Sequence, residues 1–340
     1  MIVEEGKIKI LAPNVNLRGP GKIEGVFYNR AMVFNRDTSI FLLYNLRVKN
    51  ALDALAATGV RGIRFAKELG IETTINDKDS RAVEIIKKNL ELNNVEARVT
   101  NRDANALMIE EKYNYVDIDP FGTPVPFIDS AILSGKIIGI TATDTATLGG
   151  RNRRIVRRYL ADVCAPTELV HEIGIRVLLG YIGRMAVRFD LGIEPIISIW
   201  QGHFYRVYVR IKKGVSKANA TLEKIKNTEF GGPIWVGEMH DFSFLKNSKI
   251  PEWLPTKKIL EKYLSIWKNE KFFLFYHLPS ISSELRVSTP SPRQIIENLK
   301  EQGYEAYPTQ FSPQGIRSNA PVDVLKDIIK SANSSHWESQ

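Results

Sequence analysis

A carboxylate, a proline, an aromatic ring and a glycine follow one another at Asp119-Pro120-Phe121-Gly122. The β-prone run 113–118 precedes them, so Asp119 falls at the end of a predicted strand. Ligands of open α/β sheets bind at the carboxyl edge of the strands. An acceptor-rich turn beside an aromatic ring suits the binding of a flat base through its face and its exocyclic amino group. In isolation the motif equally fits a strand exit with a solvated aspartate, so the elements around it must decide.

Strand-like and helix-like patterns alternate around this motif from residue 50 onward. Apolar positions at helical spacing separate short β-prone runs, and such alternation predicts a parallel sheet with helices on both faces. Asp79 or Ser80 is expected to cap one of these helices, and Asn35 or Asp37 an earlier one. The predicted strands are 51–55, 72–75, 97–100, 113–118 and 136–141.

Glycines and acids stand at the ends of these strands in a fixed order. Gly59 and Gly62 follow the first strand and allow close approach of a ligand to the backbone. Asp77 follows at roughly the 20-residue separation expected of a ribose-binding carboxylate, and Asp103 after the third strand can accept from an adenine amino group. Each acid alone also fits a solvated or capping carboxylate. The ordered set, ending in Asp119, resembles the class I (Rossmann-like) S-adenosylmethionine methyltransferases.

Length and charge set wider limits. The 340 residues predict about two domains, and 47 Lys and Arg against 38 Asp and Glu give a net charge of +9. This excess favours a polyanionic partner, nucleic acid before membrane, although a basic surface can also bind nothing. The single cysteine, Cys164, excludes an internal disulfide and a cysteine-based zinc cluster. The first residues lack a signal-peptide pattern and no run has the length of a membrane helix, so a cytoplasmic protein is expected.

Residues 151–158 contain five arginines. At helical spacing four of them share one side, opposite apolar residues, as on an ordinary solvated helix face. Because the segment follows the presumed active edge, phosphate contact is the competing interpretation. The four arginines expected to contact a polyanion are Arg153, Arg154, Arg157 and Arg158.

The second half of the chain reads differently. A long apolar helix is predicted over 167–189; His171-Glu172 in it is not a zinc-protease motif, because Ile175 stands at the second histidine position. Strongly β-prone residues follow from residue 195, where we expect a domain boundary, and residues 204–211 alternate with period two. Beyond them come two helical patterns, 256–267 and 291–300, and a hairpin-like stretch over 304–321. Residues 1–194 would form an N-terminal extension, irregular or hairpin-rich over residues 1–30, and the catalytic domain. Residues 195–330 would form a smaller α+β accessory domain, and 331–340 a disordered tail.

Taken together, motifs spread along the chain resemble the archaeal and eukaryotic tRNA (guanine-26 N2)-dimethyltransferases. The resemblance covers nearly the whole chain in order. The matching segments are 27–29, 35–37, 52–64, 119–122, 141–145, 232–237 and 311–316.

The resemblance implies an enzyme that transfers one and then two methyl groups from S-adenosylmethionine to N2 of guanosine 26 in tRNA. It implies that Asp119 and Pro120 act on the amino group, with Phe27 and Phe121 flanking the guanine. One departure is that many relatives carry cysteine pairs before the G-P-x-W segment, which this chain lacks, so zinc is not expected. No obligate protein partner is evident. The residues implied to bind the methyl donor are Arg36, Asp53, Gly59, Arg61, Asp77, Asp103 and Ala104.

Three other functions compete with this interpretation. An amine methyltransferase acting on another nucleic acid or on a protein glutamine would use a similar turn, but usually with a second proline where Phe121 stands. A non-catalytic RNA-binding protein would have no need of the acids Asp77, Asp103 and Asp119. A nicotinamide dehydrogenase shares the glycine turn and the ribose acid, but this turn lacks the full G-x-G-x-x-G pattern.

Overall fold

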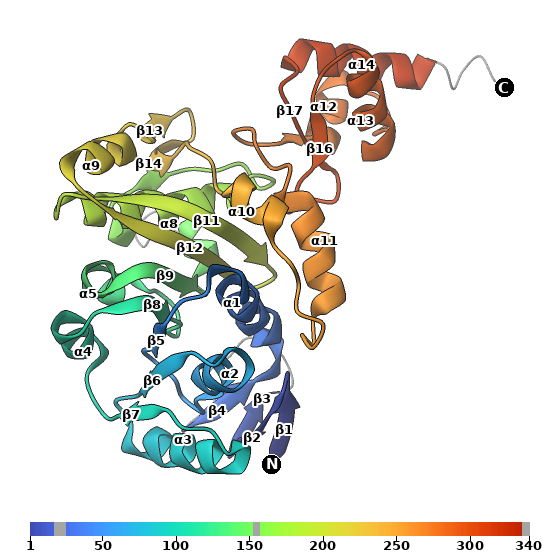
Figure 1. Cartoon of the computed structure of the whole chain (residues 1–340). Helices are drawn as coiled ribbons and strands as arrows, with labels where there is room; N and C mark the ends of the chain where they lie inside the picture. Colours follow the sequence, from blue (N-terminus) through green and yellow to red (C-terminus); the bar gives the residue numbers. More distant parts are fainter. Residues whose placement is uncertain (17–24, 152–156, 335–340) are drawn as a thin grey trace.

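A seven-stranded sheet forms the centre of the fold, with helices on both faces (Figure 1). The computed structural model describes residues 1–16, 25–151 and 157–334, without the side chains of Asn16, Phe27 and Ser334. In spatial order the strands are β11 (Leu191–Gln201), β12 (Phe204–Lys213), β9 (Gly135–Ala142), β8 (Tyr113–Ile118), β5 (Asn50–Asp53), β6 (Glu72–Asn76) and β7 (Arg98–Thr100).

The five predicted strands are all present, and they run parallel. Only β12 runs against its neighbours, β9 on one side and β11 on the other. The carboxyl ends of β5, β6, β7, β8 and β9 therefore share one edge with the beginning of β12. The predicted α/β class is confirmed.

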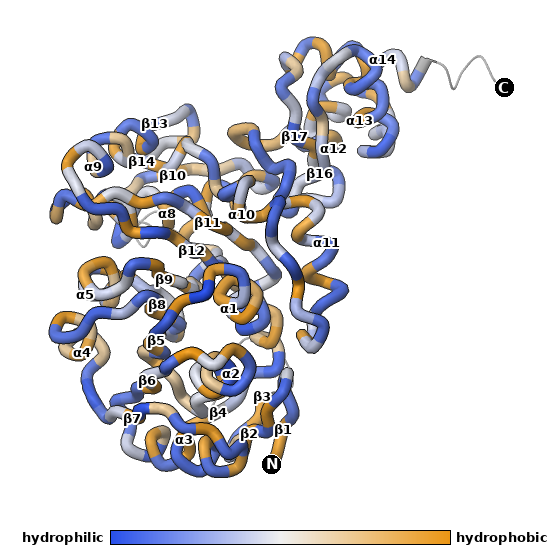
Figure 2. Tube along the Cα trace, viewed as in Figure 1, coloured by the Kyte–Doolittle hydropathy of each residue, from blue (hydrophilic) through white to orange (hydrophobic). Residues whose placement is uncertain are grey.

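Three buried clusters fix the helices to the sheet, and one of them contains Ile86 of the helix at residues 80–93 and Ile75 of β6. The helices of this part are α1 (Val33–Leu46), α2 (Val60–Leu69), α3 (Ser80–Asn93), α4 (Ala104–Glu110), α5 (Ile128–Ser134) and α8 (Val170–Val187). On one face α4, α5 and α8 pack with Val116 and Ile138, and on the other α1 and α2 pack with Ala51 and Tyr115. Figure 2 shows hydrophobic and hydrophilic residues interspersed along these helices, as one buried face per helix requires.

Local capping signals predicted some helix ends and missed another. Asp79 caps α3 by accepting from the N–H of Arg81, as expected. The expected cap at Asn35 or Asp37 is wrong, because α1 begins at Val33 after a 3-10 turn (Arg30–Met32) whose cap is Asn29. Asp37 instead lies buried inside α1 and accepts from Arg64 Nη1 at 2.7 Å, so a tertiary ion pair uses the carboxylate.

The first thirty residues add two small sheets beside α3. β1 (Ile2–Glu5) and β2 (Ile8–Leu11) form a hairpin, and β3 (Asn14–Asn16) runs parallel to β4 (Phe27–Asn29). The exposed edge of β2 is satisfied by side chains of α3: Asn89 Oδ1 accepts from Leu11 N at 2.6 Å and Asn93 Oδ1 from Lys9 N at 2.8 Å. The lead-in is thus hairpin-containing, as expected, and is held to the catalytic sheet.

The sheet continues across residue 195, where we expected a domain boundary. β11 spans Leu191–Gln201, and β12 pairs with β9 from Tyr205 opposite Ala142 to Arg210 opposite Ile137. The period-two alternation of this region indicates an antiparallel pair but not which strand it joins. Separate folding of 1–194 and 195–330 stays a prediction, while strand pairing carries the central sheet to residue 213.

The remaining elements lie beyond or beside the sheet. Helices predicted over 256–267 and 291–300 are present, and the predicted hairpin-like stretch holds β16 and β17, which pair antiparallel. In Figure 1, α12, α13, α14, β16 and β17 stand together away from the sheet. The bounds are α6 (Thr145–Leu148), β10 (Asp162–Val163), α9 (Val215–Leu222), β13 (Ile225–Thr228), β14 (Gly231–Trp235), α10 (Phe242–Asn247), α11 (Lys257–Trp267), β15 (Tyr276–His277), α12 (Leu278–Leu285), α13 (Pro292–Glu301), β16 (Ala306–Pro308), β17 (Gly315–Ser318) and α14 (Val322–Ser334).

The disordered tail that we expected over residues 331–340 was predicted to begin too early in the sequence. α14 runs to Ser334, so residues 331–334 are helical, while 335–340 lie outside the described residues. The apolar side of this helix was not recognised in the sequence; Leu325 and Ile329 are buried against Leu278 and Ile295. Within the described ranges, no helix is both long and apolar enough to cross a membrane.

A buried ion cluster ties the C-terminal elements to α8. Arg317 of β17 contacts Glu172 of α8 at 2.8 Å and Glu270 at 3.3 Å, and all three side chains are fully buried. Glu172 also pairs with Arg176 at 2.7 Å. Burial favours the neutral form of Glu270, but Arg317, His240 and Thr309 together outweigh it and hold the pKa of this carboxyl well below its usual range.

Removing Arg317 should therefore destabilise the whole chain. Arg317→Ala leaves Glu172 and Glu270 buried without their shared cation, and breaking a buried pair costs about 3–5 kcal/mol. Urea unfolding followed by circular dichroism measures the loss. The control Arg293→Ala removes an exposed arginine on α13 that pairs with Glu297 and should change stability by less than about 0.5 kcal/mol. Equal stabilities of the two variants would contradict a structural role for the cluster.

Candidate active site

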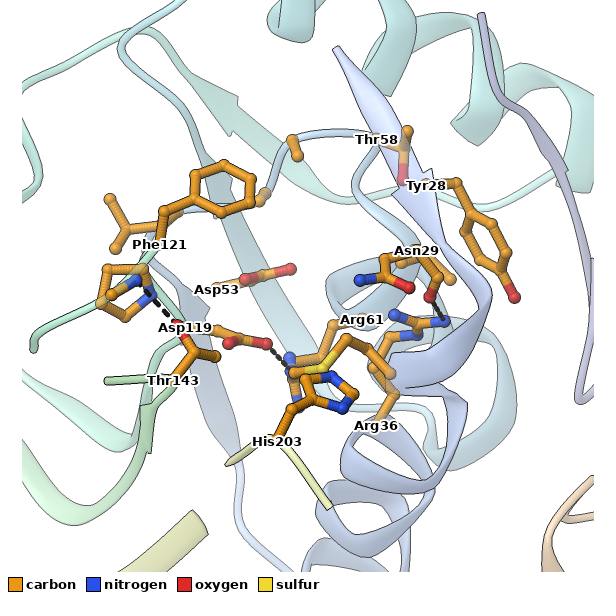
Figure 3. Close-up of a pocket in the computed structure, with 17 residues that line it drawn as sticks. Tyr28, Asn29, Arg36, Asp53, Thr58, Arg61, Asp119, Phe121, Thr143 and His203 are labelled. Atoms are coloured by element: carbon orange, nitrogen blue, oxygen red, sulfur yellow. Dashed lines mark hydrogen bonds and ion pairs between the residues drawn. The ribbon is translucent and has the colours of Figure 1, made fainter. Parts of the chain in front are cut away.

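A cavity of about 320 Å³ lies at the carboxyl edge of the sheet (Figure 3). Four stretches of the chain meet around it: residues 28–36, residues 53–61, residues 119–143 and the turn between β11 and β12. The predicted site residues that line it are Arg36, Asp53, Arg61, Asp119, Pro120 and Phe121.

The turn after β8 holds Asp119 and Phe121 at this cavity. Gly122 adopts φ +78°, which a residue with a side chain rarely does. Its N–H donates to Thr143 Oγ1 at 2.8 Å, and its carbonyl accepts from Thr143 N at 3.0 Å. The turn is thus pinned to the end of β9. Phe121 is 61% exposed and lines the cavity.

Arg61, in the first turn of α2, orients the Asp119 carboxylate. Its guanidinium is buried, pairs with Asp119 Oδ2 and contacts Asp117 Oδ1 at 3.2 Å. It also donates to Asn35 Oδ1 at 2.7 Å and to Ser39 Oγ at 2.5 Å. The dashed contact in Figure 3 between Asp119 and Arg61 is this ion pair.

Arg206 of β12 supports the pair of Arg61 and Asp119 through Asp117, which both arginines contact. It forms an ion pair with Asp117 and donates to Thr141 Oγ1 at 2.8 Å. The hydroxyl of Tyr115 donates to Asp117 Oδ2 at 2.5 Å. Burial favours the neutral form of Asp117, but Arg206 and Arg61 outweigh it and lower its pKa. Asp117 is therefore a buried anion between two cations. The sequence did not indicate that Arg206, from beyond residue 195, belongs to this edge.

Asp53, at the end of β5, is a carboxyl of the cavity whose pKa is raised. Its Oδ2 accepts from the N–H of Gly62 at 2.9 Å. Burial, reinforced by the negative charge of Asp117, raises the pKa of Asp53 to about 7, against the opposing effect of Arg61. A cationic group bound beside Asp53 would therefore favour its ionised form.

Arg36 reaches the cavity from α1, and Glu5 fixes its position. Glu5 Oε1 accepts from Arg36 Nε at 2.8 Å and from Arg64 Nη1 at 2.8 Å, while the Tyr28 hydroxyl donates to Oε2 at 2.5 Å. Burial opposes ionisation, yet the two arginines lower the pKa of Glu5 to about 2. A single glutamate in an N-terminal strand carries no sequence signal for this role.

The glycine turn after β5 is tightly built. Gly59 has φ +77°, and a Cβ there would meet Ile86 at 3.0 Å. Asp77 holds the same turn: its Oδ2 accepts from Ala57 N at 2.8 Å and its Oδ1 from Asp79 N at 2.9 Å. Asp77 thus stands beside the predicted nucleotide site, although it is not among the residues that line either described cavity at this edge.

A second, smaller cavity of about 210 Å³ holds the other predicted nucleotide-binding residues. Asp103 and Ala104 line it together with Phe127, and Leu55 lines both cavities. Asp103 Oδ1 also caps α4, accepting from Asn105 N at 3.0 Å and Ala106 N at 3.1 Å. The sequence did not indicate Phe127, which also lines this cavity.

Some predicted residues fall partly or wholly outside the described parts. The backbone of Phe27 forms β4, and its neighbours Tyr28 and Asn29 line the larger cavity, but the Phe27 side chain lies outside the described residues. Arg153 and Arg154 also lie outside them. Arg157 and Arg158 stand in a short 3-10 turn (Arg157–Tyr159) and are exposed.

Metal ligation has no clear candidate in the parts that the structure covers. Across residues 1–16, 25–151 and 157–334, no group of three or more His, Cys, Asp or Glu side chains is arranged to hold a metal ion. The cavity instead combines carboxylates with two paired arginines, a donor and acceptor set for an organic ligand.

The fold and this edge define a Rossmann-like methyltransferase: a parallel sheet, a tight glycine turn after its central strand, and acids at successive strand ends. Comparisons with known proteins agree. A family model described as "N2,N2-dimethylguanosine tRNA methyltransferase" matches residues 6–230 and 223–330. The chain belongs to this family.

Individual relatives show how far the similarity extends. The tRNA (guanine(26)-N(2))-dimethyltransferase of Pyrococcus horikoshii is 37% identical, with 96% of this chain and 97% of the relative covered. The enzyme of the same name from Thermoplasma volcanium is 34% identical, with 97% and 98% covered. The solved structure of Trm1 from P. horikoshii with S-adenosyl-L-methionine superposes with a TM-score of 0.86 at 36% identity, covering 97% of this chain and 99% of that one. These matches support the first interpretation over the amine methyltransferase alternative.

The raised pKa of Asp53 makes a prediction about stability. Because the pKa of Asp53 is about 7 in the folded chain and returns towards its ordinary value of 3.8 on unfolding, ionising it opposes folding, and the free energy of unfolding falls as pH rises through this window. Asp53→Asn removes that cost. At pH 8 the variant should be more stable than the wild type by about 4 kcal/mol, with the difference falling below about 1 kcal/mol near pH 4.

Thermal unfolding of the ligand-free proteins at pH 4, 6 and 8 measures this difference. Asp323→Asn, at an exposed carboxylate in the first turn of α14, serves as the control and should show no such pH dependence. A difference for Asp53→Asn that does not grow with pH would show that Asp53 is ionised at no cost.

Proposed function

We propose that this chain is a cytoplasmic enzyme that transfers one and then two methyl groups from S-adenosylmethionine to the exocyclic N2 of guanosine 26 in tRNA. The main support is that Asp119 and Pro120 line the same cavity as Asp53 and Arg36, in a chain that belongs to the N2,N2-dimethylguanosine tRNA methyltransferase family. The relatives named above carry this activity in their names.

The two cavities fit the methyl donor in size and chemistry. Leu55 lines both, so the larger space beside the glycine turn and the smaller one beside Asp103 are neighbours. We assign Arg36, Asp53, Gly59 and Arg61 to the amino-acid and sulfonium part. Asp77 would hold the turn that faces the ribose, and Asp103 with Ala104 would contact the adenine, opposite Phe127. When bound, S-adenosylmethionine supplies an electrophilic methyl group.

The side chains of the β8 turn prepare the amino group of the guanine. Its nitrogen lone pair is delocalised into the ring and is a poor nucleophile. We assign one N2–H to Asp119 Oδ1, since Arg61 contacts Oδ2, and the other to the Pro120 carbonyl. Two such acceptors draw the nitrogen towards tetrahedral geometry and aim its lone pair. As the new N–C bond forms and the methyl–sulfur bond of the donor breaks, Asp119 takes the N–H proton. After one transfer a single N–H remains, and Asp119 can accept its proton once the first has passed to solvent.

The target base has to leave its stack to reach this turn. Unstacking a nucleotide costs a few kcal/mol, and enzymes that flip bases offset this with aromatic contacts. The exposed ring of Phe121 is placed for that contact, and Phe27 is assigned to the other face of the base on the family resemblance.

Asp119→Ala tests the assignment directly. The variant should fold and bind both S-adenosylmethionine and tRNA, but lose transfer by about 100-fold or more, since it loses both the orienting acceptor and the proton acceptor. Mass spectrometry of nucleosides from a guanosine-26 transcript reports the base, the site and the number of methyl groups together. The control Asp129→Ala removes an exposed aspartate that pairs with Arg188 and should leave turnover unchanged. Near-normal turnover of Asp119→Ala would remove Asp119 from the mechanism.

The basic segment after β9 is assigned to tRNA phosphates. Arg157 and Arg158 are exposed. The next residue, Tyr159, donates to Asp144 Oδ1 at 2.9 Å. Because Asp144 follows β9 at the active edge, this bond holds the two arginines close to that edge. Arg153 and Arg154 are assigned to the same contact on their sequence position.

Replacing Arg157 and Arg158 together by alanine should raise the KM for tRNA by about tenfold at physiological salt. It should also lower the slope of log KM against log salt by about 1–2, because each phosphate that is no longer neutralised reduces this slope by about 1. Affinity for S-adenosylmethionine should not change. Arg98→Ala, at the opposite end of the sheet on β7, is the matched control. An unchanged salt slope in the double variant would place the phosphate-binding surface elsewhere.

A further inference from the structure

The turn between β11 and β12 contributes one residue, His203, to the larger cavity. The other described residues that line this cavity lie between Tyr28 and Thr143, so His203 alone comes from the later part of the chain. In Figure 3 its side chain projects from this turn into the cavity that Arg61 and Asp119 also line. No sequence motif surrounds this histidine, and nothing in the mechanism above uses it.

Strand order places His203 on one particular side of Asp119. The order β12, β9, β8, β5 sets the end of β8, with Asp119, between the glycine turn after β5 and the beginning of β12. β12 runs antiparallel to β9, with Tyr205 opposite Ala142, so its first residues stand at the same carboxyl edge. His203 therefore lies across Asp119 from the turn assigned to the methyl donor, on the side left for the base.

The His203 ring has an unused hydrogen-bonding atom. Its Nε2 is buried and has no hydrogen-bond partner in the described part of the chain. His171, His240 and His277 each place one ring nitrogen in a hydrogen bond, to Tyr205, Glu270 and Ser280 respectively. The other ring nitrogen of His240, Nδ1, is also buried without a partner in the described part of the chain, but His240 does not line this cavity. A buried polar atom without a partner destabilises the folded chain, and in a native structure it calls for an explanation.

The chemistry of the ring limits what the partner can be. Burial lowers the pKa of His203, so the ring is neutral at physiological pH and can donate or accept one hydrogen bond at each nitrogen. A neutral ring is a poor partner for phosphate. With both N2 hydrogens assigned to Asp119 and Pro120, the same edge of the guanine still presents a donor, N1–H, and an acceptor, O6.

We propose that His203 is a specificity-determining residue that hydrogen-bonds the N1–O6 edge of the target guanine. The inference rests on the proposed function, because it takes Asp119 and Pro120 as the groups that hold N2. His203 does not act on the reacting nitrogen. It distinguishes a purine with guanine's N1–H and O6 from one that carries only the 2-amino group.

A substrate with the reacting group but without that edge provides the test. Transcripts carrying guanosine or 2-aminopurine at position 26 both present a 2-amino group, but 2-aminopurine lacks N1–H and O6. For wild type, His203→Phe and His203→Gln, we would measure kcat/KM on both transcripts. Wild type should prefer guanosine, and His203→Phe should lower kcat/KM for guanosine by about 10–100-fold, as expected when a buried group loses one hydrogen bond.

The ratio of kcat/KM between the two substrates separates specificity from a general effect. His203→Phe should leave kcat/KM for 2-aminopurine within about twofold of wild type, since this base has neither the N1–H donor nor the O6 acceptor that His203 contacts in guanine. His203→Gln, which keeps a donor and an acceptor, should recover part of the preference for guanosine. His277→Phe, at a half-buried histidine of β15 that is remote from the cavity lining, is the control and should behave as wild type. Calorimetric binding of S-adenosylmethionine confirms that each variant is folded; if His203→Phe fails there, His203→Ala replaces it.

The outcomes separate this inference from the proposed function. Equal losses of kcat/KM on both transcripts in His203→Phe would show a merely structural role and overturn the inference alone, as would an unchanged ratio. A wild-type chain that binds tRNA but leaves guanosine 26 unmethylated would overturn the proposed function and this inference with it.

Discussion

Asp117 lies buried between two arginines, Arg61 and Arg206, and the carboxyl edge of the sheet depends on this alternation of charge. Each guanidinium needs the aspartate, because an uncompensated buried charge costs several kcal/mol. Arg61 extends the series to Asp119 and so fixes the reacting turn. Arg206 brings in β12, and with it the turn that carries His203. One ion-pair chain thus connects α2, β8 and β12, and the first and last of these elements are separated in the sequence by more than a hundred residues.

The parts of the fold that local signals control could be predicted. The apolar runs of β5 and β8 and the capping aspartate of α3 act within a few residues, and the sequence pattern indicated them. The start of α1 could not be predicted, because Asp37 is a good capping residue whose carboxylate instead pairs with Arg64 and Thr256. The alternation of β12 likewise indicates a strand but carries no information about its neighbour. The sequence pattern carries no information about partners that lie far away along the chain.

The same distinction holds for the site. Acids at strand ends share one edge once the sheet is parallel, so Asp77, Asp103 and Asp119 could be placed at this edge from their order along the chain. Glu5 could not, because its importance comes from two arginines that other elements bring to it. His203 could not either, since a single histidine in a turn has no periodicity or motif. Residues reach a site by topology as often as by sequence spacing.

The position of β12 between β9 and β11 also dictates an order of events during synthesis. The strand that completes the edge of β9 ends at residue 213, and the helix whose start contacts Asp37 comes later, with Thr256 N donating to Asp37 Oδ2 at 2.8 Å. Until the ribosome has released these residues, the nascent chain exposes one side of β9 and part of α1. Long-range pairing of this kind slows folding and leaves apolar surface open meanwhile. The N-terminal half of the chain therefore acquires its native surface only when most of the protein has been made.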